Sequence, residues 1–347
     1  MNKAPIKQDE RLTQTSVLTK VLRRPELGAF LGALVIYIVF CAFDQSGNFL
    51  TLGGTARWLD VSAVTGIMAI PVTLLMIGGE FDLSAGVMQG STGIVFALLT
   101  TRVHMNMFLA LFLTFLLAGA IGFLNGYLVV KTRLPSFIVT LATFFILRGA
   151  NLGFSQLWTG TVRITGVSKE PHYEILRKIL TTSVWDPNQF NVNLFWWAGF
   201  LVLASYILTN SKYGNWIAAV GGDQNSARNS GVPVKSTKIW LFVIVSLTAS
   251  FVGIMQTIRF DGMQASNGIG DEFTFIIAAV VGGALLTGGY GSIIGAALGS
   301  SIIGIAFIGI AYANWDTDWN WTFLGAILFV AVSVNTFTRR RAEKAKK

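Results

Sequence analysis

The chain has 347 residues, of which 53% are apolar and only 12% are charged, and its mean hydropathy is +0.61. A soluble domain carries about twice that share of charged residues, so the composition excludes an ordinary water-soluble enzyme and a disordered chain. The formal net charge of +9 does not indicate nucleic-acid binding, because the basic residues follow the expected membrane topology rather than a compact basic face.

The counts of cysteine and histidine exclude several kinds of site. One cysteine, Cys41, and two histidines, His104 and His172, cannot form an internal disulfide, a thiolate cluster or a histidine-rich metal site. The sequence also lacks the Gly-Lys-Ser/Thr loop that binds phosphate. We therefore expect no metal, no bound cofactor and no nucleotide hydrolysis by this chain alone.

Apolar runs recur along the whole chain at about the 20-residue length that crosses a bilayer as a helix. The absence of alternating ten-residue segments favours helices over membrane strands. The expected spans are residues 27–43, 61–78, 85–101, 107–130, 134–152, 193–210, 239–259, 273–288, 291–313 and 321–337. The expected fold is thus an all-α polytopic membrane protein with about ten transmembrane helices.

Most of the 26 Lys and Arg residues share one side of the membrane if the N-terminus is cytoplasmic. They lie in the N-terminal segment 1–26, the short loop 131–133, the long loop 211–238 and the tail 338–347. Cytoplasmic loops are enriched in Lys and Arg. We therefore expect both termini in the cytoplasm, a membrane domain over residues 27–337 in the inner (plasma) membrane, and an external insert at 153–192.

The order of the spans permits an internal symmetry. The second span enters the membrane from the outside, and the seventh enters from the inside. Spans two to five and seven to ten can therefore form an inverted repeat, which is a common plan among transporters.

Three stretches carry a resemblance to a known family. They are Gly78–Gly86 (GGEFDLSAG), Gly214–Val232 (GNWIAAVGGDQNSARNSGV) and Ala278–Gly295 (AAVVGGALLTGGYGSIIG). In this order and spacing they resemble the membrane permease of ribose-type monosaccharide importers of the ATP-binding cassette (ABC) class. The chain departs from the family pattern at Glu80-Phe81, where the first motif is one residue longer, and at Asn225 and Ser226.

The resemblance implies a transport subunit and not an enzyme. Such a chain forms the path for a monosaccharide or sugar alcohol by alternating access, and a separate cytosolic subunit binds and hydrolyses the ATP. The implied partners are that ATPase, a periplasmic or extracellular substrate-binding protein and a second permease copy, identical or not. The alternatives are an ion-coupled secondary transporter, a passive channel and, within the family, a permease for amino acids or nucleosides.

Polar residues beside or inside the spans are candidates for the substrate path. Glu80, Asp82 and Ser84 follow the second span, and Asn125 lies inside the fourth. Carboxylate, hydroxyl and amide oxygens accept hydrogen bonds from sugar hydroxyls. Two alternatives stay open: Asp82 or Ser84 caps the third span, which their residue types favour, and Asn125 bridges two helices.

The loop 211–238 carries the second motif. Its polar residues 223–230 predict about two helical turns, ended by Gly231 and Pro233. The resemblance implies that this is the coupling helix held by the ATPase, and an ordinary solvated loop is the alternative. The residues assigned to coupling are Gly221, Gly222, Asn225, Ala227, Arg228, Ser230 and Gly231.

Two further features of the second half have structural or functional interpretations. Asp271 and Glu272 precede the eighth span on the expected outside, where they either favour the helix N-terminus or dock the substrate-binding protein. The glycines between 282 and 299 predict close helix packing, because small residues let backbones approach each other in lipid.

Overall fold

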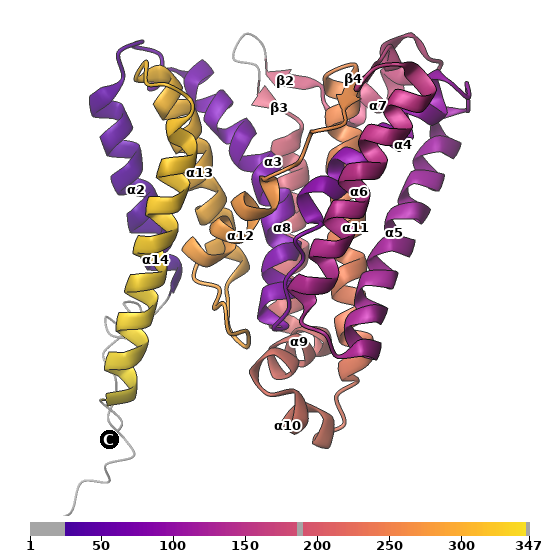
Figure 1. Ribbon diagram of the computed structural model, residues 1–347. Helices are drawn as coiled ribbons and strands as arrows, with labels where there is room; N and C mark the ends of the chain where they lie inside the picture. Colours follow the sequence, from indigo (N-terminus) through magenta and orange to yellow (C-terminus); the bar gives the residue numbers. More distant parts are fainter. Residues whose placement is uncertain (1–24, 186–189, 345–347) are drawn as a thin grey trace, which may run out of the picture.

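The computed structural model describes residues 25–185 and 190–344 of the chain (Figure 1). Residues 1–24 of the expected N-terminal segment and residues 345–347 of the expected tail lie outside the described residues. The bundle is formed by α2 (Pro25–Phe43), α3 (Leu52–Ile77), α4 (Ala85–Thr101), α5 (Met107–Thr132), α6 (Ser136–Thr159), α8 (Asn193–Asn210), α11 (Val234–Arg259), α12 (Asp271–Val281), α13 (Ile293–Tyr312) and α14 (Trp319–Lys344).

Short elements cap the two ends of this bundle. They are β1 (Arg163–Thr165), η2 (Val167–Lys169), α7 (Tyr173–Leu180), β2 (Ser183–Trp185), β3 (Phe190–Asn191), α9 (Lys212–Gly222), α10 (Gln224–Asn229) and β4 (Gly262–Gln264). β1 pairs antiparallel with β4, and β2 with β3. We call the end that carries α9 and α10 the α10 end, and the opposite end the β4 end (Figure 1).

The helices confirm a polytopic membrane protein. Within the described ranges, six helices are long and apolar enough to cross a membrane, and α8 with α9 would make a seventh although the pair bends by 74°. Each of the ten expected segments contains a helix. The largest shift is at α3, which begins at Leu52. α6 and α14 both end later than expected, at Thr159 and Lys344, so the first residues of the segment 153–192 continue α6.

The eighth expected span, 273–288, is wrong in length. α12 has 11 residues and rises about 16 Å, about half of the hydrocarbon thickness. The backbone N–H of Gly283 bonds to the carbonyl of Val280, and its φ is +92°. Only glycine adopts that conformation readily, so Gly282-Gly283 ends the helix inside an apolar run. Mean hydropathy cannot detect such a turn.

The inverted repeat is confirmed by equivalent packing in α3–α6 and α11–α14. α3 packs most extensively on α13, and its counterpart α11 does so on α5. α4 contacts α11 and α6, while its counterpart α12 contacts α3 and α14. α3 runs from the β4 end toward the α10 end, and α11 runs the opposite way (Figure 1). The two sets therefore have the same internal order and opposite directions.

Glycine brings α12 and α13 into backbone contact. A Cβ atom added to Gly282 would lie 2.3 Å from the carbonyl carbon of Gly295, and one on Gly299 would lie 2.0 Å from the carbonyl oxygen of Ala278. No larger residue fits at these positions without moving a backbone. The packing role predicted for the glycines between 282 and 299 is confirmed.

Candidate functional site

Two interrupted helices meet in the middle of the bundle. α4 follows the non-helical loop 78–84, and α12 follows the non-helical segment 265–270. A Cβ atom on Gly86, at the start of α4, would lie 2.3 Å from both Glu272 Oε2 and the carbonyl oxygen of Gly268. Unwound backbone beside half-helices at a repeat interface is where many transporters bind their substrates.

Hydroxyl groups of α6 hold the loop 78–84. Ser136 Oγ accepts a hydrogen bond of 3.0 Å from the backbone N–H of Phe81, and Thr140 Oγ1 accepts one of 3.0 Å from that of Leu83. Peptide groups at membrane depth need partners inside the protein. The two hydroxyls therefore replace helix hydrogen bonds that the interruption removes.

Asp82, Ser84 and Asn125 form one buried chain of hydrogen bonds. Asp82 Oδ1 accepts from the backbone N–H of Ser84 at 2.8 Å and from its hydroxyl at 2.5 Å. Asn125 Nδ2 donates to Ser84 Oγ at 3.2 Å, and Asn125 Oδ1 accepts from Thr143 Oγ1 at 2.6 Å. The structure thus brings three predicted path residues together, and Asn125 bridges α5 to α6 and to the loop.

The predicted capping of the third span by a side chain is wrong. Ser84 stands directly before α4, but its side chain accepts no helix N–H group. Its hydroxyl instead donates to Asp82, which binds the N–H of Ser84 itself. The second carboxylate oxygen of Asp82 is buried and has no hydrogen-bond partner in the described part of the chain.

Glu80 points to a different partner. Its carboxylate forms an ion pair with the ammonium group of Lys238 on α11, and the two residues are 6% and 7% exposed. Lys238 belongs to the basic set of the loop 211–238, yet it lies inside the protein. Because a buried charge is costly without its partner, this pair fixes the loop 78–84 to α11.

The segment 211–238 contains the short helix expected over residues 223–230. Asp223 precedes α10 and accepts a 2.6 Å hydrogen bond from the backbone N–H of Ser226. That bond to the ionised carboxylate holds the pKa of Asp223 below its usual range. Gly231 follows α10 with φ +81°, as expected for a helix stop. Asn225, Arg228 and Ser230 are exposed at the α10 end, whereas Ala227 is buried under the helix against Val220 and Val234.

Backbones of three segments touch beside α10. Gly289 N–H donates to the carbonyl oxygen of Ile77 at 2.8 Å. A Cβ atom on Gly221 would lie 1.7 Å from the same oxygen, and one on Gly288 would lie 2.7 Å from Gly79 Cα. We call this contact the glycine junction; it consists of Gly79, Gly221, Gly222, Gly288 and Gly289. It joins the ends of α3 and α9 to the loop 282–292.

Sequence reasoning missed several of these residues. The glycine pairs at 78–79, 221–222 and 288–289 were visible, but nothing in the sequence indicates that they contact one another. Lys238 was assigned only a topological role, and the α6 hydroxyls were not singled out. Contacts between such distant positions depend on how the helices pack.

Asp271 and Glu272 lie within the bundle. Asp271 accepts from Gln89 on α4, and Glu272 Oε2 accepts from the backbone N–H of Gly270 at 3.0 Å. Glu272 is 3% exposed. The alternative in which this pair docks a soluble protein is therefore wrong, because the carboxylates face α4 and the start of their own helix.

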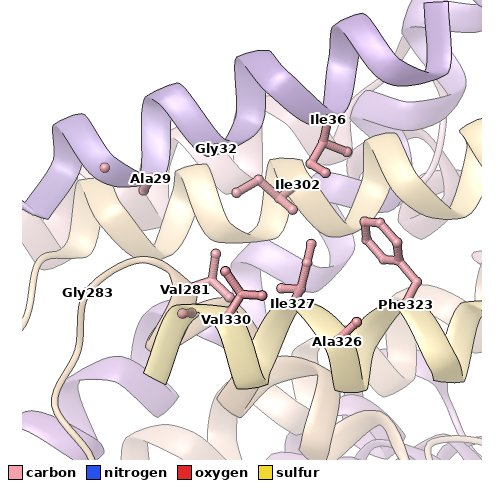
Figure 2. Close-up of a pocket in the computed structure, with 12 residues that line it drawn as sticks. Ala29, Gly32, Ile36, Val281, Gly283, Ile302, Phe323, Ala326, Ile327 and Val330 are labelled. Carbon is pink, nitrogen blue, oxygen red and sulfur yellow. The ribbon is translucent and has the colours of Figure 1, made fainter. Parts of the chain in front are cut away.

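A pocket of about 330 Å³ lies apart from these polar groups, between α2, α13 and α14 (Figure 2). Ile36, Ile302 and Phe323 are among the side chains that point into it, and every lining residue is apolar. Its side chains offer no hydrogen bonds to a hydroxylated solute. This pocket is therefore unsuited to a sugar.

The family model described as "Branched-chain amino acid transport system / permease component" matches residues 54–332. The chain belongs to this permease family. The ribose import permease protein RbsC of Escherichia coli (strain K12) is 30% identical to this chain over 309 residues, which cover 87% of this chain and 91% of the relative. No solved structure gives a match.

Two other relatives extend the comparison. The xylose transport system permease protein XylH of Escherichia coli (strain K12) is 27% identical over 361 residues, covering 90% of this chain and 92% of the relative. The inner membrane ABC transporter permease protein YjfF of the same strain is 27% identical over 306 residues, covering 88% and 89%. The predicted resemblance to ABC importer permeases of the ribose type is confirmed, and the chain is a multi-pass transport subunit of the inner membrane.

Proposed function

We propose that this permease forms the path for a monosaccharide through an ABC importer. The observation that carries the proposal is the match, over about nine-tenths of both chains, to permeases named for xylose and ribose. The buried hydrogen-bond chain of Asp82, Ser84 and Asn125 supports it, because such groups bind hydroxyls or hold the loop that does so. A sugar alcohol has the same chemistry.

The α10 end faces the cytosol and binds a separate ATPase subunit. The described basic loops 131–133 and 211–238 both lie at this end (Figure 1), which supports the orientation because Lys and Arg are enriched on the cytoplasmic side. The exposed Asn225 and Arg228 of α10, with Ser230 directly after it, form the docking surface. The opposite, β4 end then receives the sugar from a substrate-binding protein, and a second permease copy completes the complex.

The glycine junction carries the movement of the ATPase to the path. α9 touches the end of α3 and the loop 282–292 by backbone atoms, with no flexible side chain between them. A displacement of α10 therefore shifts the loops beside α4 and α12 directly. The partner subunit uses the ATP. This chain alternates between two conformations of the path, and a ligand changes their populations by binding one conformation more tightly than the other.

Reconstitution tests the proposal. The permease, its ATPase and its binding protein are placed in proteoliposomes, and uptake of labelled ribose, xylose and leucine is measured with and without ATP. We expect ATP-dependent uptake of a sugar. Uptake of leucine in preference to both sugars would overturn the substrate class, and uptake driven by an ion gradient without ATP would overturn the ABC mechanism.

A further inference from the structure

A pocket of about 390 Å³ lies between the two repeats in the half of the bundle nearer the β4 end. Its walls come from α3 and α4 of the first repeat and from α11, α12 and α13 of the second. The volume falls within the range of about 300–1,000 Å³ that is usual for small-molecule sites. Unlike the apolar pocket of Figure 2, it combines charged, amide and aromatic side chains.

Gln89 and Asp271 form a polar pair in this pocket. Gln89 Nε2 donates to Asp271 Oδ2 at 2.5 Å, which joins α4 to α12. Gln89 is 1% exposed, and its Oε1 atom is buried with no hydrogen-bond partner among the residues that the structure describes. Buried amide oxygens are nearly always hydrogen-bonded. This oxygen therefore indicates a donor from outside the chain, and a sugar hydroxyl is such a donor.

Arg259 is fixed on another side of the pocket. Its Nη2 atom lies 2.7 Å from Asp60 Oδ2. Asp60 Oδ1 accepts from Asn191 Nδ2 at 2.9 Å and from Asn193 Nδ2 at 2.8 Å, so both carboxylate oxygens are engaged. The guanidinium group has five N–H donors in a rigid plane. Once Asp60 holds it, the remaining donors are available to oxygen atoms in the pocket.

Aromatic and hydroxyl side chains complete the lining. Phe275 of α12 and Phe307 of α13 provide apolar surface, and Thr274 adds a hydroxyl group. A monosaccharide has hydroxyls on its edge and C–H groups on its faces. Planar polar groups that bind the edge, combined with rings that cover a face, match both kinds of surface.

We propose that this pocket binds the monosaccharide during its passage and contributes to the choice of sugar. Gln89 and Asp271 bind hydroxyl groups from the α4–α12 side, and Arg259 donates from the α11 side. Gln89 lies one turn from Gly86, where the two interrupted helices meet. The pocket therefore lies between the β4 end, which receives the sugar, and the centre of the path. This inference rests on the proposed function.

Competition between a sugar and its deoxy analogues tests the pocket. The complete reconstituted complex is used with an unaltered binding protein and ATPase, and initial rates are compared for the best transported sugar and for each monodeoxy form. In the Gln89→Leu and Asp271→Asn variants, we expect the rate ratio for at least one deoxy position to change by about tenfold, the effect of one hydrogen bond. A merely structural role would slow all sugars by the same factor.

Two further variants make the result decisive. Thr100→Ala changes a buried hydroxyl on the same helix that bonds only to α4 carbonyls, and its rate ratios are expected to equal those of the wild type. Thr274→Val tests a second lining residue of α12 if a first variant does not reach the membrane. Unchanged ratios in all pocket variants, with sugar uptake by the wild type, would overturn the pocket alone. A wild-type complex that takes up no monosaccharide would overturn the proposed function and this inference together.

Discussion

Individual polar residues in this permease are held by partners from distant parts of the chain. Glu80 and Lys238 are separated by 158 positions and form a buried ion pair. Replacing one partner of such a pair leaves an uncompensated charge in the interior, whereas replacing both removes the cost. The pair therefore specifies where the loop 78–84 sits against α11.

Glu80→Gln is expected to destabilise the permease by about 3–5 kcal/mol, because the ammonium group of Lys238 loses its counter-charge. The double variant Glu80→Gln with Lys238→Met should recover much of that loss. The apparent melting temperature in detergent is the measurement. Glu174→Gln is the matched control, since it breaks a pair with Arg177 in which the side chains are 64% and 43% exposed, and exposed pairs contribute little. Equal melting temperatures for Glu80→Gln and Glu174→Gln would contradict the prediction.

At the scale of elements, the contact of α3, α9 and the loop 282–292 depends on the absence of side chains. Gly221 and Gly222 are adjacent but have different surroundings. A Cβ atom on Gly221 would overlap the carbonyl of Ile77, whereas one on Gly222 would have no heavy atom of another segment within 4 Å. Substitution of each glycine in turn therefore distinguishes the effect of close backbone packing from the effect of losing a glycine.

Gly221→Ala is expected to lower ATP-dependent uptake by at least about tenfold, because the obstructing atoms belong to backbone and cannot rotate away. Gly222→Ala should keep nearly normal uptake. Uptake and co-purification of the ATPase are measured on equal amounts of folded protein. If the two variants behave alike, direct backbone contact is not the route of coupling.

The cap of α10 has a defined pH dependence. The N–H of Ser226 lowers the pKa of Asp223 from its ordinary value of 3.8. The cap therefore stabilises α10 while pH is above that ordinary value, and its contribution is lost as pH falls through the lowered pKa. Between about pH 8 and pH 5 we therefore expect the backbone amides of α10 to stay equally protected from hydrogen exchange with solvent.

Hydrogen–deuterium exchange of peptides over residues 224–230, corrected for intrinsic rates, measures this protection. Asp223→Asn should retain it, because Asn also caps helices, and Asp223→Ala should reduce it at every pH. Protection that falls between about pH 7 and pH 5 in the wild type would show that another group controls the helix.

At the scale of the whole molecule, the described chain begins and ends at the same end of the bundle. α2 begins beside the loop 282–292, where Ser292 Oγ donates to Glu26 Oε1 at 2.7 Å, and α14 ends at the α10 end (Figure 1). The inverted repeat places the interrupted helices α4 and α12 between the two ends. The two ends of the molecule thus differ, as expected if one binds the proposed ATPase and the other receives the solute.

Single cysteines test this orientation in a Cys41→Ser background. Ser183→Cys in β2 and Ser226→Cys in α10 are both exposed positions at opposite ends. We expect a membrane-impermeant maleimide to label position 183 in intact spheroplasts and position 226 only after permeabilisation. Labelling of position 226 in sealed spheroplasts would invert the proposed topology.

Much of the element structure is predictable from local sequence. Apolar runs locate the helices because a membrane span must satisfy its own backbone over a fixed length. Asp223 and Gly231 bound α10 because capping and positive φ are properties of single residues. The same reasoning fails at 273–288, where a glycine turn interrupts a uniformly apolar segment, and at Ser84, whose hydroxyl is engaged by Asp82 and Asn125.

Composition, charge and short-range patterns are enough to predict a helical membrane protein and a polar helix after its sixth span. The permease family is predicted by the resemblance of three motifs, and the order of the spans only permits the inverted repeat that helix packing confirms. The pairing of Glu80 with Lys238, the contact of three glycine segments and the pocket shared by Gln89 and Asp271 become visible only in the folded protein. Such contacts join residues far apart in the chain, and their distances are set by helix packing, which no local pattern encodes.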